Sequence, residues 1–145
     1  MSPARIVLDA SIAVAWCFED EKTADSEWAL DAIASGAGPL VPALWPYEVA
    51  NALLAAERRK RVTGAQAAHF LSRLGNLGIS IDDSHPSRTF EQVTSHAREW
   101  DLTVYDAAYL ELAMREGLPL ATLDAGLKSA AHRAGVRIAG PAHSK

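Results

Sequence analysis

The sequence has a single cysteine, no long apolar run and no basic-then-apolar leader. Cys17 is the only cysteine among 145 residues, which excludes an internal disulfide. Its place in the apolar stretch SIAVAWCF favours a small buried side chain over a nucleophile or a metal ligand. No apolar run is long enough to span a bilayer, and the first residues lack a secretory pattern. We therefore expect a cytoplasmic protein without a membrane segment.

Several patterns typical of other protein classes are also missing. The five histidines show no pairing at zinc-site spacing. No G-x-G-x-x-G turn is present, which argues against a dinucleotide-binding domain. The formal net charge is −4, and this disfavours a protein that coats nucleic acid non-specifically. An enzyme that acts on nucleic acid through a cluster of acids is still compatible with that charge.

Short apolar segments alternate with longer helical patterns along the chain, whose length fits a single domain over 1–145. Strands are predicted at 5–9, 40–42, 79–82, 119–122 and 136–139. Helices are predicted from Ala10, at 24–35 and 46–61, after the capping-box pair Thr63 and Gln66, and at 87–99, 105–116 and 125–134. This alternation predicts an α/β fold, in which a mainly parallel sheet of roughly five strands lies between two layers of helices.

Three aspartates are predicted at one end of this sheet, where parallel sheets usually bind their ligands. Asp9 closes the first strand, Asp124 follows the fourth strand, and Asp106 opens the helix between the third and fourth strands. Glu48 lies inside a helix whose neighbouring surface is apolar, and Asn51 follows it three residues later. A carboxylate that faces an apolar core must be compensated.

Each acid alone also has a simpler interpretation. Asp106 and Asp124 could be helix caps or first-turn acids, Asp9 could cap the helix that starts near Ser11, and Glu48 could pair with an arginine. If the acids lie close together, these simpler interpretations become less favourable. Two like charges about 4 Å apart repel each other by roughly 4 kcal/mol at an effective dielectric constant of about 20. Several gathered carboxylates therefore require a cation. An all-oxygen ligand set favours Mg²⁺ or Mn²⁺, which activate water and neutralise charge on a phosphoryl group.

Four segments, IVLDASIAVAW, LWPYEVANALL, LTVYDAAYLELA and LPLATLDAGLKSAA, resemble those of PIN-domain ribonucleases, and among these the VapC-like toxins of bacterial toxin–antitoxin pairs. Their order, spacing and context agree from about Ile6 to Ala139. The resemblance implies an acidic, metal-binding catalytic quartet of Asp9, Glu48, Asp106 and Asp124. It also implies that nearby polar residues position ligands or water, namely Ser11, Asn51 and Thr122.

The same resemblance implies an activity and partners. It implies a five-stranded sheet, dependence on Mg²⁺ or Mn²⁺, and hydrolysis of single-stranded or loop RNA to a 5′-phosphate and a 3′-hydroxyl. VapC-like toxins usually form homodimers and are inhibited by a small cognate antitoxin, whose tail fills a groove and often brings a basic residue near the acids. One departure is that Ala125 and Gly126 stand where some relatives have a further acid, so a second metal ion would be weakly held or absent.

Two further stretches have alternative interpretations. Tyr105, Tyr109, Leu110 and Leu112 are predicted to pack the helix that carries Asp106, although Tyr109 could instead stack on an RNA base. The basic run in ERRKR is either a solvated helix end that complements the helix dipole or a strip that contacts RNA phosphates or the antitoxin. The residues of this strip are Arg58, Arg59, Lys60 and Arg61.

Proteins of other classes fit the sequence less well. A non-catalytic PIN-like module that binds RNA or protein would normally have lost one of the four acids, and none is lost here. A phosphate-receiving signalling domain would have an adjacent acidic pair after the first strand and a lysine near the last strand. The segments LDAS and VRIAG contain neither feature. A metal-dependent endoribonuclease is therefore the leading hypothesis.

Overall fold

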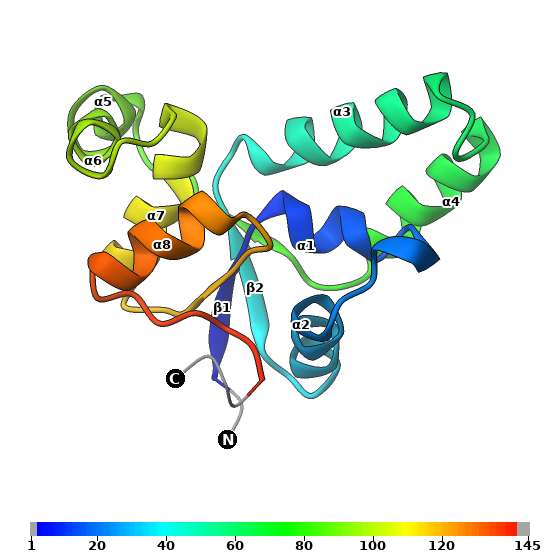
Figure 1. The fold of residues 1–145 in the computed structure, drawn as a ribbon, viewed down its shortest axis with the longest axis horizontal. Helices are drawn as coiled ribbons and strands as arrows, with labels where there is room; N and C mark the ends of the chain where they lie inside the picture. The colour runs from blue at the N-terminus through cyan, green and yellow to red at the C-terminus, as the bar shows by residue number, and fades with distance from the viewer. Residues whose placement is uncertain (1–2, 142–145) are drawn as a thin grey trace.

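A parallel sheet of four strands forms the centre of the computed structural model, which describes residues 3–141 (Figure 1). The strands are β1 (Arg5–Leu8), β2 (Gly38–Val41), β3 (Ser80–Ile81) and β4 (Leu120–Ala121), in the spatial order β3-β2-β1-β4. Each neighbouring pair is parallel. The central strand β1 is apolar and fully buried from Ile6 to Leu8, as expected for a strand covered on both faces.

The predicted fifth strand, at 136–139, is reduced to an isolated bridge. Ile138 pairs in parallel with Leu120, and two backbone hydrogen bonds of 2.9 Å accompany this pairing. The segment therefore lies beside β4, where a fifth strand would be, but the prediction of a complete strand is wrong. Because β4 itself has only two residues, it offers too little backbone for a longer ladder.

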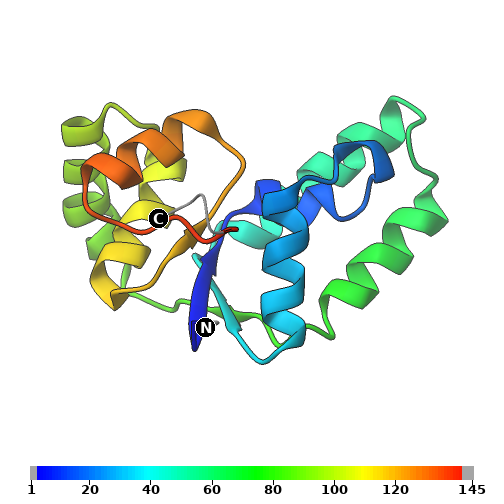
Figure 2. The same cartoon turned by 60° about the horizontal axis from the view of Figure 1, so that its bottom comes forward.

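Helices cover both sides of the sheet, so the predicted three-layer α/β architecture is confirmed. Figures 1 and 2 show α1–α4 on one side and α5–α8 on the other. The first group is α1 (Ala10–Ala15), α2 (Ala24–Ala34), α3 (Trp45–Arg58) and α4 (Gly64–Leu74). The second group is α5 (Pro86–Arg88), α6 (Thr94–Trp100), α7 (Val104–Glu116) and α8 (Ala125–Arg133). A short 3-10 turn, η1 (Glu19–Glu21), precedes α2, and a π-helical turn, η2 (Thr89–Val93), joins α5 to α6.

Local sequence explains several helix boundaries. The predicted capping box at the start of α4 is present, since Thr63 and Gln66 each accept a hydrogen bond from the other's backbone amide. Helix α3 ends at Arg58, three residues before its predicted end, because Lys60 adopts a left-handed conformation with φ 61°. The predicted helix at 87–99 is interrupted by the π-helical turn.

The apolar core joins the sheet to helices on both sides. Ile6, Leu8, Leu53 and Leu110 are among its fully buried side chains. Cys17 is half-buried and packs against this core, so it is less enclosed than its sequence context predicts. Across residues 3–141, no helix combines the length and the apolar character needed to cross a membrane.

Candidate active site

The carboxyl ends of the four parallel strands meet at one edge of the sheet, and this edge positions the predicted polar residues. Asp9 follows β1, and Thr122 follows β4. Because these two strands are paired side by side, the two side chains lie in contact. The Thr122 hydroxyl donates a hydrogen bond to Asp9 Oδ2 at 2.6 Å, and both residues are buried.

A short hydrogen-bond relay fixes the Asp9 carboxylate. Ser11 Oγ donates a second hydrogen bond to Asp9 Oδ2 at 2.7 Å. The two hydroxyls are themselves held by backbone amides, because the Leu123 amide donates to Ser11 Oγ and the Asp124 amide donates to Thr122 Oγ1, each at 3.0 Å. Both hydroxyl donors thus act on the same oxygen of Asp9, Oδ2.

The three aspartates differ in their relation to helix ends. Asp9 occupies the N-cap position of α1, yet its side chain makes no capping hydrogen bond. Asp106 lies in the first turn of α7, where the cap is Thr103, whose hydroxyl accepts from the Asp106 amide at 3.1 Å. Asp124 is a true N-cap of α8, since its Oδ2 accepts from the Leu127 amide at 2.7 Å. The simpler interpretation as a cap therefore holds for Asp124, which still has a second oxygen.

Glu48 lies in the first turn of α3 and is hydrogen-bonded to a tyrosine rather than paired with an arginine. Tyr109 Oη donates to Glu48 Oε1 at 2.5 Å, across the sheet edge from α7. No ion pair within residues 3–141 includes Glu48. Asn51, one turn further along α3, is exposed.

The two tyrosines of α7 have different environments, and sequence reasoning missed the polar role of one of them. Tyr109 is completely buried, so packing is confirmed and stacking on RNA is excluded. The sequence did contain a signal for this polar role. Tyr109 lies three residues after Asp106, on the same helix face, and a buried tyrosine hydroxyl usually needs a hydrogen-bond partner. Tyr105 is 64% exposed, and its predicted packing role is wrong.

Burial is the main influence on the Asp9 carboxyl, and it raises the pKa above the ordinary value. Hydrogen bonds from Thr122, Ser11 and the Ala10 amide lower the pKa and partly offset the burial. The nearby charge of Asp124 raises it again. Another acid therefore adds to the cost of ionising Asp9.

Glu48 and Asp106 are affected in the same direction. Burial raises the pKa of Glu48, the hydrogen bond from Tyr109 lowers it, and the charges of Asp9 and Asp106 raise it further. Burial also raises the pKa of Asp106, followed by the charges of Asp124 and Asp9. The edge of the sheet thus gathers carboxyl groups that disfavour one another's ionisation.

The donor set suits a hard divalent cation in its chemistry. Carboxylate oxygens are the preferred ligands of Mg²⁺ and Mn²⁺, and a cation among the acids would relieve the repulsion described above. Within residues 3–141, however, no three Asp, Glu, His or Cys side chains are already arranged to hold an ion. Binding would therefore require these side chains to rotate toward a common point.

The basic run at the end of α3 divides into two parts. Arg58, Arg59 and Lys60 are exposed. Arg61 is also exposed, but it forms ion pairs with Asp20 and Glu21, and its guanidinium lies 4.3 Å from the centre of the Phe18 ring. Arg61 thus links the end of α3 to η1, while an RNA or antitoxin contact by the run stays a prediction.

The sequence family follows from a comparison of the whole chain. A family model described as PIN domain matches residues 6–133. The chain belongs to the PIN-domain family. This confirms the resemblance inferred from the four sequence segments, and the matched range contains Asp9, Glu48, Asp106 and Asp124 of this PIN domain.

One sequence relative of this PIN domain has a VapC name, and two solved structures are similar to it in fold. Ribonuclease VapC3 from Pyrobaculum aerophilum is 31% identical over 120 residues, which cover 83% of this chain and 89% of the relative. The crystal structure of PAE2754 from the same organism has a TM-score of 0.67 and 27% identity, and the match covers 90% of this chain and 87% of that chain. VapC20 from Mycobacterium tuberculosis, a toxin that cleaves the sarcin–ricin loop, has a TM-score of 0.57 at 15% identity, with 86% and 94% covered.

Proposed function

We propose that this PIN domain is a metal-dependent endoribonuclease and the toxin of a bacterial toxin–antitoxin pair. The observation that carries the proposal is the group of carboxyls at the sheet edge, in which Asp9, Glu48 and Asp106 are each affected by the charge of another acid. Such a group disfavours its own ionised form unless a cation is bound. The relative named Ribonuclease VapC3 supports the same activity.

The proposed site assigns a role to each side chain. Asp9, Glu48 and Asp106 would bind Mg²⁺ or Mn²⁺ directly, and Asp124 would bind it directly or through water. When bound, the ion lowers the pKa of a coordinated water molecule and neutralises charge that develops on the phosphoryl oxygens.

The surrounding hydrogen bonds orient these ligands. Ser11 and Thr122 hold Oδ2 of Asp9, so Oδ1 would be the oxygen that binds the ion. Tyr109 holds Oε1 of Glu48, so Oε2 would be the oxygen that binds the ion. No side chain would be required as a covalent nucleophile, because water activated by the bound ion would supply the attacking oxygen.

The proposed partners are RNA, a small cognate antitoxin and a second copy of the chain, all in the cytoplasm. Support for the antitoxin comes from the VapC names of the relatives. The electrostatics agree, since a patch of carboxylates is a suitable target for an arginine from an inhibitor. Mixing the purified chain with the product of an adjacent small reading frame should then give a complex by size-exclusion chromatography and abolish cleavage.

Cleavage of RNA by the purified, partner-free chain tests the activity. Total cellular RNA would be incubated with Mg²⁺ or Mn²⁺, with EDTA in a parallel sample, and the product ends would be mapped. We expect discrete, metal-dependent cuts that disappear in Asp106→Asn. The matched control is Asp31→Asn, an exposed aspartate on α2, which should cut as the natural chain does.

Two results would contradict the proposal. Cuts that persist in EDTA or in Asp106→Asn would place the activity elsewhere or in a contaminant. A folded chain that binds Mn²⁺ in calorimetry but cuts no RNA would instead favour a non-catalytic binding module.

A further inference from the structure

A cavity of about 280 Å³ lies at the same edge of the sheet as the acids, on the side of β3 and β2. Its lining includes Asp82, which directly follows β3, and Pro42, which directly follows β2. In the sheet order β3-β2-β1-β4, the next strand is β1, which is directly followed by Asp9. The cavity and the carboxyl cluster are therefore neighbours along one row of parallel strand ends.

The starts of α3 and α7 contribute residues to both the cavity and the carboxyl cluster. Leu44 lines the cavity, and its carbonyl accepts the backbone hydrogen bond of Glu48 one helical turn later. Tyr105 also lines the cavity and directly precedes Asp106. At about 100° per residue around a helix, Tyr105 lies on the ridge of α7 between the cavity face and the face that carries Asp106.

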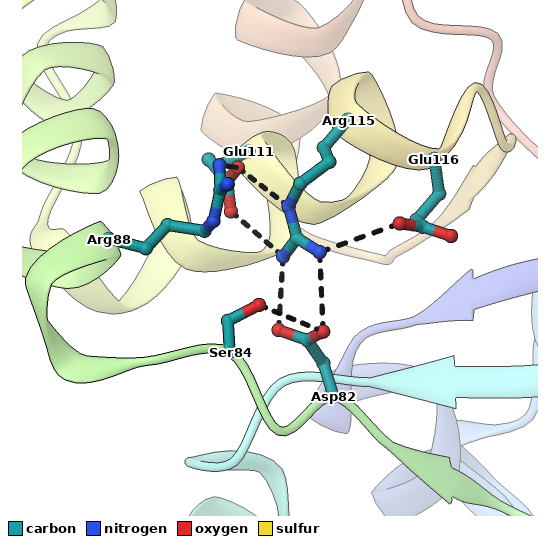
Figure 3. Close-up of polar contacts among 6 residues, drawn as sticks. All are labelled: Asp82, Ser84, Arg88, Glu111, Arg115 and Glu116. Carbon is teal, nitrogen blue, oxygen red and sulfur yellow. Dashed lines mark hydrogen bonds and ion pairs between the residues drawn. The ribbon is translucent and has the colours of Figure 1, made fainter.

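The polar floor of the cavity is an ion-pair network of two arginines with three acids (Figure 3). Arg115 bonds to Asp82 at 3.0 and 3.2 Å and to Glu111 at 2.9 and 3.2 Å. Arg88 reaches the same Glu111 at 3.1 Å from the opposite side. Two arginines thus face two acids within the lining, and Arg115 also pairs with Glu116 at 3.4 Å, so the network has no excess of positive charge for an anion.

The walls are apolar or aromatic. Val104 and Ala108 line the cavity on α7, beside Tyr105, whose side chain is 64% exposed. The Arg88 side chain, which lines the same cavity, is 37% exposed. Aromatic rings and guanidinium planes are the surfaces on which unpaired bases stack, and a polar floor without excess positive charge suits the edge of a base better than it suits a phosphate.

We propose that this cavity binds one unpaired nucleobase of the RNA, next to the phosphate held at the acids, with Tyr105 and Arg88 as its stacking surfaces. The proposal rests on the proposed function. In this proposal, the residues that follow β3 and β2 select the RNA segment, and those that follow β1 and β4 take part in cleavage. Cleavage positions should therefore depend on the base that enters the cavity.

Steady-state cleavage of a short single-stranded RNA tests the cavity. Tyr105→Ala should raise KM by about 5- to 150-fold, the range of losing one base–aromatic stack, with a smaller change in kcat, because uniform binding is lost. Tyr105→Phe keeps the ring and should stay within about twofold of the natural chain. The control is Tyr47→Ala, which removes a tyrosine that is 78% exposed on α3.

A second measurement separates this proposal from the proposed function. Asp106→Asn would be titrated in EDTA with oligonucleotides that carry 2-aminopurine at successive positions. We expect quenching at one position, which Tyr105→Ala removes and Tyr105→Phe keeps, whether or not any RNA is cut. The proposal is overturned if Tyr105→Ala leaves KM, cut sites and quenching unchanged, or if sedimentation shows that it dissociates a dimer, since the face would then be a subunit interface.

Discussion

Replacing Tyr109 by phenylalanine isolates the hydrogen bond that holds Glu48. The ring is completely buried, and phenylalanine preserves its packing while removing only the hydroxyl. Glu48 then loses the donor at 2.5 Å from Oε1. The variant therefore changes the polar contact without opening a cavity.

The size of the effect follows from the environment of the carboxylate. A hydrogen bond to a charged group contributes about 1.5–3 kcal/mol to stability. Glu48 is only half-buried, so water can replace part of the lost contact, and we expect a value near the lower end, about 1.5 kcal/mol. For a chain of this length that corresponds to a decrease in Tm of about 3–6 °C.

The loss of stability in Tyr109→Phe should depend on pH in a defined direction. Burial raises the pKa of Glu48 above its ordinary value of 4.5, and the Tyr109 hydroxyl lowers it. Removing the hydroxyl raises the pKa further, so ionisation of Glu48 costs the variant more stability as the pH rises through that value. The difference from the natural chain should be largest at neutral pH and should shrink as the pH falls through the folded-state pKa of Glu48.

Thermal unfolding followed by circular dichroism across this pH range would measure the effect, with Tyr47→Phe as the matched control because that ring is 78% exposed. We also expect weaker Mn²⁺ binding and slower RNA cleavage by Tyr109→Phe. Equal Tm values for the variant and the natural chain at neutral pH, together with unchanged metal affinity, would refute the role given to the hydroxyl.

Two other changes test the contacts around the site. Thr122→Val keeps the shape of a buried side chain but removes a donor to Asp9, so urea denaturation should show a loss of about 1–3 kcal/mol, and equal stability would contradict the relay. Arg115→Ala should lower the free energy of unfolding by about 3 kcal/mol, since Glu111 is left buried with one fewer cation. Although burial raises the pKa of Asp82, hydrogen bonds from Arg115 and Ser84 and the Arg115 charge lower it overall. The stability that these contacts contribute should be lost as the pH falls below 3.8, and this loss should be smaller in Arg115→Ala, which keeps only the Ser84 contacts.

The sequence by itself determined the order of strands and helices and the positions that carry acids. Apolar periodicity is a local property, so β1, the capping box of Thr63 and Gln66, and most helix boundaries could be predicted from short windows. The rule that ligands bind at the carboxyl ends of parallel strands then pointed to Asp9, Asp106 and Asp124. These predictions needed no knowledge of which side chains touch.

Only the tertiary structure decided the contacts between distant segments. The hydrogen bond from Tyr109 to Glu48 joins residues 61 positions apart, and that from Thr122 to Asp9 joins residues 113 positions apart. No periodic pattern encodes such pairs, because they depend on how α7 and β4 are placed against α3 and β1. The short pairing at Ile138 has the same origin, since the length of a strand is limited by the backbone that its neighbour presents.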